Sequence, residues 1–195
     1  MSALERGKSA VERGDAASDT ELFEGVARGD LGPLGELFDR HHASVRAFAQ
    51  RLLVNPADAD DLVQETFLTA SRAAASFEPG AAAKPFLLGV AAQLARRRRR
   101  SFARLRAMLS SFSEAPVPAR ETPEQAAVAA QESELLQASL ARLSDDHREV
   151  LLLVDMSGLS GVDAAKALGV PAGTVWRRLH EARLELRETH RRRIG

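Results

Sequence analysis

The chain of 195 residues has no cysteine, which excludes a disulfide framework, a thiolate metal site and a thiol nucleophile. Nor does it have a run of the ~20 apolar residues that a membrane-spanning helix needs. Residues 1–18 mix small and charged side chains without the apolar core of a signal peptide, and we interpret them as a disordered extension. These absences predict a soluble protein of the cytoplasm.

Features of an enzyme are also missing. Asp39, His41 and His42 suggest a metal site at first sight, but adjacent histidines point apart on a helix and no spaced ligand cluster accompanies them. The sequence has no phosphate-binding loop and no arrangement of nucleophile and base. We therefore expect no catalytic residue, metal, cofactor or small-molecule substrate.

The formal net charge is zero, but the two signs are segregated along the chain. Asp19–Glu78 has 11 acidic and 5 basic residues, and Ala107–Trp176 has 10 acidic and 4 basic residues. Lys84–Arg106 has 8 basic residues and no acidic one, and Arg177–Gly195 has 7 basic and 3 acidic residues. The two basic blocks predict two contacts with a polyanion, and the acidic segments predict a basic partner. The alternative is that the arginine-rich helices are simply solvated.

Every periodic segment predicts a helix, and no apolar alternation indicates a strand, so we expect an all-α protein of two small domains. Residues 19–106 are predicted to form the first domain and residues 123–193 the second, with a flexible proline-containing linker at 107–122. Within the first domain, Ser18–Glu21 is a capping box, and Asn55-Pro56 is predicted to be an N-cap followed by an N1 proline. The second helix is expected to bury a stripe made of Leu34, Phe38, Val45, Phe48 and Leu52.

The most specific motif, at Gly161–Leu186, predicts a helix-turn-helix. Its first helix ends at Gly169, a residue suited to a left-handed C-cap, and Pro171 can begin the second helix. Four residues of the second helix share a core face at helical spacing: Val175, Leu179, Ala182 and Leu186. In such motifs, the N-terminal end of the second helix enters the major groove of DNA.

The opposite face of this second helix is predicted to contact DNA. Its candidate residues are Gly173, Thr174, Trp176, Arg177, His180, Glu181 and Arg183. An arginine can pair with guanine or hold a phosphate, and His and Trp can contact base edges or methyl groups. The alternatives are a helical hairpin with a solvated basic face and, for Trp176, a contact with a protein partner.

An acidic patch is predicted on the third helix. Asp61, Gln64 and Glu65 lie within one turn, on the face opposite Val63 and Phe67. Such a patch suits a basic helical partner. Helix capping and solvation explain the acidic residues near the helix start, but not Gln64 and Glu65 one turn later.

Two sets of motifs, in order along the chain, resemble the extracytoplasmic-function (ECF) sigma factors of bacterial RNA polymerase. Leu143–Leu153 and Ala165–Val175 resemble domain 4, which in this family reads the −35 promoter element. Asp58–Phe67 resembles the domain 2 helix that docks on the polymerase clamp, and Lys84–Ala91 resembles the segment that handles the −10 element. The chain departs from the family pattern at Gly161, where an aromatic residue is frequent, and at Trp176, where Lys or Arg is usual.

The resemblance implies contacts with the clamp and flap of core polymerase and with promoter DNA, and by analogy an anti-sigma partner. The residues implied in core binding are Asp58, Asp61, Gln64 and Glu65. The aromatic, cationic and polar residues that suit unstacked −10 bases are Phe77, Lys84, Phe86, Gln93, Arg96 and Arg97. For the two phenylalanines, a place in the core is an open alternative.

Two other functions fit the helix-turn-helix. A stand-alone DNA-binding regulator would use the motif without polymerase, and it would need to dimerise on a palindromic site. The chain shows no heptad helix for such a dimer. An adaptor that has lost DNA binding is a third class, and the basic face of the second helix argues against it.

Overall fold

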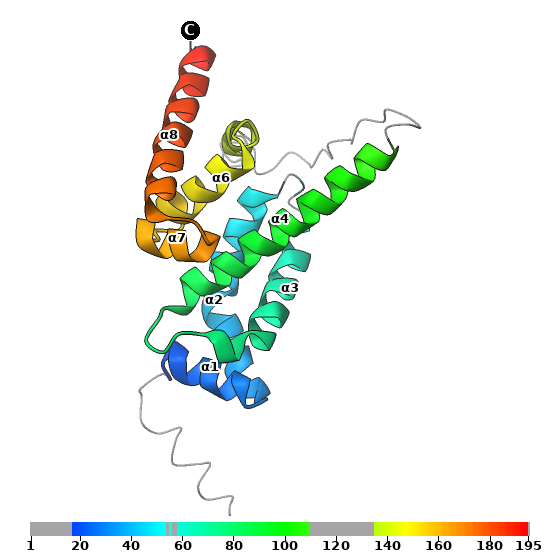
Figure 1. Ribbon diagram of the computed structural model, residues 1–195, viewed down its shortest axis with the longest axis vertical. Helices are drawn as coiled ribbons and strands as arrows, with labels where there is room; N and C mark the ends of the chain where they lie inside the picture. The colour runs from blue at the N-terminus through cyan, green and yellow to red at the C-terminus, as the bar shows by residue number, and fades with distance from the viewer. Residues whose placement is uncertain (1–16, 54, 56–57, 110–134, 195) are drawn as a thin grey trace, which may run out of the picture.

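In the computed structural model of the protein, residues 17–53, 55, 58–109 and 135–194 are described. All regular structure in these ranges is helical, which confirms the expected all-α class (Figure 1). We call the part before the linker the first unit; it contains α1 (Asp19–Ala27), α2 (Leu31–Leu52), α3 (Ala59–Arg72), the 3₁₀ turn η2 (Ala74–Ser76) and α4 (Ala83–Leu109). The predicted linker and N-terminal extension fall largely outside the described residues.

The second unit contains a helical segment at 135–140, then α6 (Asp145–Leu151), the π-helical turn η3 (Leu152–Met156), α7 (Gly161–Leu168) and α8 (Ala172–Ile194). Helices α6 and α7 begin at serine caps, and α7 ends at the predicted glycine. The Ser144 and Ser160 hydroxyls accept hydrogen bonds from the backbone N–H groups three residues later, and Gly169 ends α7 with φ = 66°.

Two local predictions are wrong. The third helix begins at Ala59 and not directly after Asn55, whose side-chain amide instead donates to Asp58 at 3.3 Å. In α2, Leu37 is buried while Phe38 is 37% exposed. The buried face of α2 changes along its length because its N-terminal part packs on α1, whereas its C-terminal part packs on α4 and the second unit.

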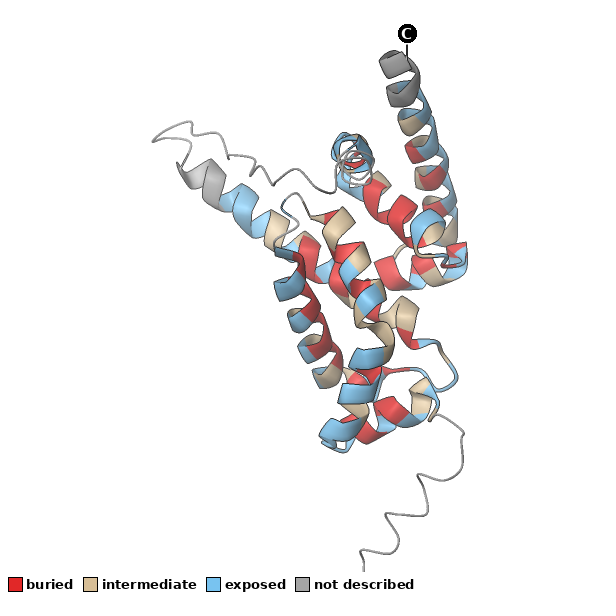
Figure 2. Ribbon diagram, turned by 180° about the vertical axis from the view of Figure 1, so that it is seen from behind, coloured by how far each residue is buried: buried red, intermediate tan, exposed pale blue. Residues whose placement is uncertain are grey.

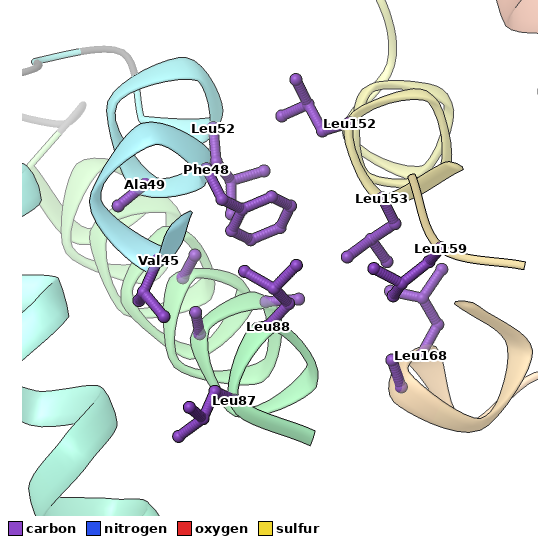
Figure 3. Packing of buried hydrophobic residues seen from close by; sticks show 14 of the residues in the cluster. Val45, Phe48, Ala49, Leu52, Leu87, Leu88, Leu152, Leu153, Leu159 and Leu168 are labelled. Carbon is purple, nitrogen blue, oxygen red and sulfur yellow. The ribbon is translucent and has the colours of Figure 1, made fainter. Parts of the chain in front are cut away.

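The two units share one hydrophobic core, because α7 packs on α4 and η3 packs on the end of α2. Figure 3 shows Phe48 and Leu88 of the first unit pointing toward Leu152 and Leu153 of the second. In Figure 2, buried residues gather where these helices face one another, and residues 100–104 of α4 are exposed. Gly89 permits the close approach, since a Cβ atom there would lie 2.9 Å from the Ala167 carbonyl oxygen.

A buried arginine also joins the units. The guanidinium of Arg148 donates to the carbonyl oxygens of Leu140 at 2.8 Å, Leu143 at 3.3 Å and Leu52 at 3.3 Å. Leu52 is the last residue of α2, so the cation meets the negative end of that helix. Burial lowers the pKa of Arg148, but an arginine stays protonated in a protein.

We predict that a single proteolytic cut in the linker at 107–122 leaves the two fragments associated. The shared core and the bonds of Arg148 hold the units together without help from the linker. Gel filtration of the nicked protein should therefore give one peak that contains both fragments. Two separate folded fragments at micromolar concentration would contradict a stable interface.

Candidate functional site

The acidic patch of α3 is present and accessible. Asp61 and Gln64 are exposed, and Glu65 is half-buried beside them. Glu65 accepts hydrogen bonds from Nη2 and Nε of Arg98 on α4, at 2.6 and 3.1 Å, so its charge is partly compensated. Leu68, one turn after Gln64, is exposed and adds an apolar group to this face. The patch therefore offers a partner the carboxylate of Asp61, which has no ion pair with another described residue, together with the amide of Gln64 and the side chain of Leu68.

The acidic residues at the start of α3 have different roles. Asp60 accepts a hydrogen bond from Nε of Arg46 at 2.6 Å, and this bond lowers the pKa of the Asp60 carboxyl. Asp58 occupies the N-cap position without a side-chain capping bond, and it is exposed. Asp58 is thus accessible to a partner, while Asp60 holds α3 to α2.

Two arginines of the basic block on α4 face the second unit. Arg96 donates from Nε to Glu149 Oε2 at 2.6 Å, and Nη2 of Arg99 pairs with the other oxygen of the same carboxylate. Arg99 also pairs with Asp145 at 3.1 Å. Glu149 is 0% exposed, so its carboxylate is fully buried between the two arginines. We call the three residues Arg96, Arg99 and Glu149 the interdomain ion cluster.

A neighbouring face of α4 carries a separate exposed stripe at spacings i, i+4, i+7 and i+11: Gln93, Arg97, Arg100 and Arg104. None of its arginines makes an ion pair with another described residue. Gln93 and Arg97 were predicted as −10 contacts, whereas Arg100 and Arg104, exposed on the same face, were not. Their helical spacing from Arg97 was the signal that could have found them.

The two phenylalanines of the predicted aromatic platform pack in the core of the first unit, where Phe77 is buried and Phe86 is half-buried. Phe77 is buried and stacks on Phe23 with ring centroids 4.1 Å apart, and Phe86 packs edge-on against both rings. Phe77 is therefore a core side chain in this conformation. Lys84 donates to the carbonyl oxygen of Ser157 at 2.6 Å, so this cation is engaged by the second unit.

Several of these residues line a groove of about 890 Å³ between the loop before α4 and helix α7. Phe86 and Gln93 lie on the first unit's side, and Asp163 and Lys166 lie on the side of α7. The fold thus brings predicted −10 residues together, with α7 as the facing wall. Among the described residues, no cluster of three metal-binding side chains occurs, and no helix has the length and apolarity to cross a membrane.

In the helix-turn-helix, the predicted core face of α8 packs inward and the predicted DNA-binding face is largely exposed. Val175, Leu179 and Ala182 are buried, and α8 projects away from the first unit in Figure 1. The predicted DNA-binding residues that are exposed are Gly173, Trp176, Arg177, His180 and Arg183; Thr174 and Glu181 are half-buried. The face is therefore available to a ligand.

Ion pairs hold three side chains of this face. Glu181 bridges Nη1 of Arg177 and Nε2 of His147, each at 3.1 Å. Desolvation raises the pKa of Glu181, but the bonds and charges of Arg177 and His147 outweigh it, and the pKa lies below its ordinary value. Arg183 is held by Asp155 at 2.9 and 2.6 Å. Glu181 and Arg183 therefore have structural partners within the second unit.

Comparison with known proteins agrees with this geometry. Residues 37–105 match the family model of sigma-70 region 2, and residues 133–186 match that of sigma-70 region 4. The ECF RNA polymerase sigma factor SigM of Mycobacterium tuberculosis is 35% identical over 170 residues, which cover 87% of this chain and 83% of SigM. This chain belongs to the ECF sigma factors. It is an RNA polymerase sigma factor, and a stand-alone regulator is not favoured.

Other relatives support the same family. The RNA polymerase sigma factor CarQ of Myxococcus xanthus is 33% identical over 78% of this sigma factor and 86% of CarQ. The structure of CnrH in complex with the cytosolic domain of CnrY matches with a TM-score of 0.66 and 25% identity, covering 89% and 97% of the two chains. The structure of RpoE from Bartonella quintana in complex with the anti-sigma factor NepR matches with a TM-score of 0.65 and 28% identity. The match covers 79% of this chain and 94% of RpoE. The domain boundaries between 106 and 123 stay a prediction, since residues 110–134 are not described.

Proposed function

We propose that this sigma factor binds core polymerase through the exposed face of α3, that α4 contacts the −10 element, and that the exposed face of α8 reads the −35 element. The observation that carries the proposal is that a sigma region 2 and a sigma region 4 occur in order, with the polar face of α3 in the first and the outer face of α8 in the second exposed. The protein would act in the cytoplasm as an initiation factor without catalysis of its own.

The closed packing of the two units implies a conformational step. Arg96 and Lys84, both expected at the −10 element, are bonded to the second unit, and α7 forms one wall of the groove beside them. We propose that the second unit leaves α4 when the protein joins polymerase and promoter. A partner that favours the closed form would inhibit the protein. The complex of RpoE with the anti-sigma factor NepR supports an anti-sigma partner for this chain.

The decisive experiment is transcription reconstituted from purified bacterial core polymerase, this protein and a library of promoter fragments. We expect transcripts only when the sigma factor is present, and only from fragments that share two short elements. Sequence-specific binding of the protein alone to a palindrome, without any stimulation of core polymerase, would instead support a stand-alone regulator.

We predict that replacing Asp61, Gln64 and Glu65 together with alanine weakens core binding about tenfold. Exposed polar contacts contribute up to about 1 kcal/mol each, and three of them reach the 1.4 kcal/mol of a tenfold change. The measurement is competition for core polymerase against labelled wild type, with circular dichroism to confirm helicity.

Two controls make this result specific. Glu24→Ala with Asp39→Ala removes two exposed acids from α1 and α2 and should leave core affinity unchanged. Asp61→Ala with Gln64→Ala keeps the bond between Glu65 and Arg98, so it tests the patch without freeing an arginine. Unchanged affinity of the triple variant would mean that polymerase binds elsewhere.

A further inference from the structure

Gly161 and Trp176 meet where the two helices of the motif cross. Gly161 is the first residue of α7 and is buried. A Cβ atom on it would lie 2.3, 2.7 and 2.9 Å from Cζ2, Cε2 and Cη2 of the Trp176 indole, which is closer than real Cβ contacts allow. The backbone of Gly161 does not have a positive φ, so the position needs a glycine for space and not for conformation.

The indole is held at this crossing and still faces solvent. One edge of its six-membered ring rests on Gly161, yet Trp176 as a whole is 54% exposed. It follows the buried Val175 and lies one turn before His180, on the exposed face near the N-terminal end of α8. A large ring braced in this way is ordered before any ligand arrives, which lowers the entropy cost of a contact.

We propose that Gly161 positions the indole of Trp176 so that the ring contacts a thymine methyl group in the −35 duplex. This inference rests on the proposed function. The N-terminal residues of a recognition helix reach base edges in the major groove. The thymine methyl is the apolar group that base edges offer there, and it suits contact with the largely apolar indole ring. Gly161 is then a positioning residue and Trp176 the residue that reads the base.

The neighbours of the ring favour DNA over a protein partner. Arg177 and His180 stand beside Trp176 on the same face, and Gly173, one turn earlier, leaves room for a close approach. A basic rim around an apolar ring suits a polyanion. Val162 at the start of α7 is also exposed and could form, with Trp176, an apolar surface for a protein partner. Binding of the ring to a protein is therefore the competing outcome of the experiment.

The test uses holoenzyme made with wild type, Gly161→Ala, Trp176→Ala and the double variant. Promoter duplexes carry deoxyuridine in place of one −35 thymine at a time, which removes only the methyl group. Wild-type holoenzyme should lose about fourfold in affinity when the thymine at one position is replaced, because burying one methyl group stabilises a complex by about 0.8 kcal/mol. Both single variants and the double variant should show no penalty there. Gly35→Ala, at a helical glycine with open space around it, should behave as wild type.

The free protein supplies a second readout, because Trp176 is its single tryptophan. Gly161→Ala should shift the indole emission to longer wavelength and increase acrylamide quenching as the ring swings into solvent. Gly35→Ala should change neither property. Trp176→Ala carries the binding test by itself if Gly161→Ala does not fold, since shortening an exposed side chain creates no clash.

Three results would overturn the inference. One is a thymine penalty that persists in Trp176→Ala; another is unchanged emission and unchanged penalty in Gly161→Ala. The third is loss of core binding in Trp176→Ala with base preference intact, which would assign the ring to a protein contact. A wild-type holoenzyme that binds no promoter would refute the proposed function, whereas the emission of Gly161→Ala still tests the contact with Gly161.

Discussion

Replacing Glu149 with alanine should separate the two units of the protein while each unit keeps its helices. The Glu149 carboxylate is fully buried and compensates the guanidiniums of Arg96 and Arg99, which come from the other unit. Removing one partner of a fully buried ion pair costs about 3–5 kcal/mol. We expect the lower end of that range here, because Arg99 keeps its pair with Asp145 and both arginine side chains are about a quarter exposed. In this variant, two cations would be left in the interface.

Opening of the molecule relieves that cost without unfolding either unit. When α6 and α7 leave α4, Arg96 and Arg99 regain water, so the penalty falls on the closed conformation alone. A change of about 3 kcal/mol shifts the ratio of closed to open molecules by about a hundredfold. Small-angle scattering should show a larger radius of gyration for Glu149→Ala, and circular dichroism should show unchanged helicity.

Asp145→Ala is the matched control. Asp145 pairs with the same Arg99, but it is exposed, and an exposed pair contributes at most about 1 kcal/mol. Its radius of gyration should equal that of the wild type. A compact Glu149→Ala protein would show that apolar contacts such as those of Leu88 and Leu153 close the interface without the interdomain ion cluster.

The open variant should also bind DNA with a steeper salt dependence. Arg96 and Arg99 become available to phosphates, and each phosphate that is neutralised adds about 0.9 to the slope of log affinity against log salt. Freeing both should steepen the slope for a non-specific duplex by about 2. An unchanged slope would mean that these two arginines do not reach DNA even in the open form.

The helix-turn-helix could be predicted from the sequence because its signals are local. Gly169 supplies the left-handed C-cap, and the i, i+4, i+7 spacing from Val175 places one face of α8 in the core. The acidic patch of α3 was predictable for the same reason, since it depends on the spacing within one helix. The prediction from local spacing was wrong at Phe38, which is exposed while Leu37 is buried, because packing on a neighbouring helix decides which side of α2 is buried.

Contacts between the units could not be predicted. A run of five arginines at 96–100 samples every side of a helix, so it does not show which guanidiniums meet a carboxylate about fifty positions later. The packing of the second unit on α4 decides that Arg96 and Arg99 face Glu149 of α6 while Arg97 stays exposed. Gly161 and Trp176 likewise counted as separate departures from the family pattern. Only the crossing of α7 and α8 shows that the small residue accommodates the large one.

Arg177→Ala should reduce the discrimination between a cognate and a scrambled −35 element by about ten- to hundredfold. A good pair between an arginine and guanine contributes about 1–3 kcal/mol of discrimination. Arg177 lies in the second turn of α8, on the exposed face and next to Trp176. Its ion pair with Glu181 joins two partly exposed groups, so releasing the guanidinium for a base costs about 1 kcal/mol or less.

Arg187→Ala is the control on the same helix. Arg187 is also exposed, but it lies ten residues, or about 15 Å, further along α8, where a helix leaves the bases and passes the phosphates. Its loss should weaken cognate and scrambled duplexes alike and reduce the salt slope by about 0.9. Holoenzyme affinity for both duplexes, measured at several salt concentrations, separates the two effects. Equal weakening of both duplexes by Arg177→Ala would make Arg177 a phosphate contact and would leave base reading to Trp176 and His180.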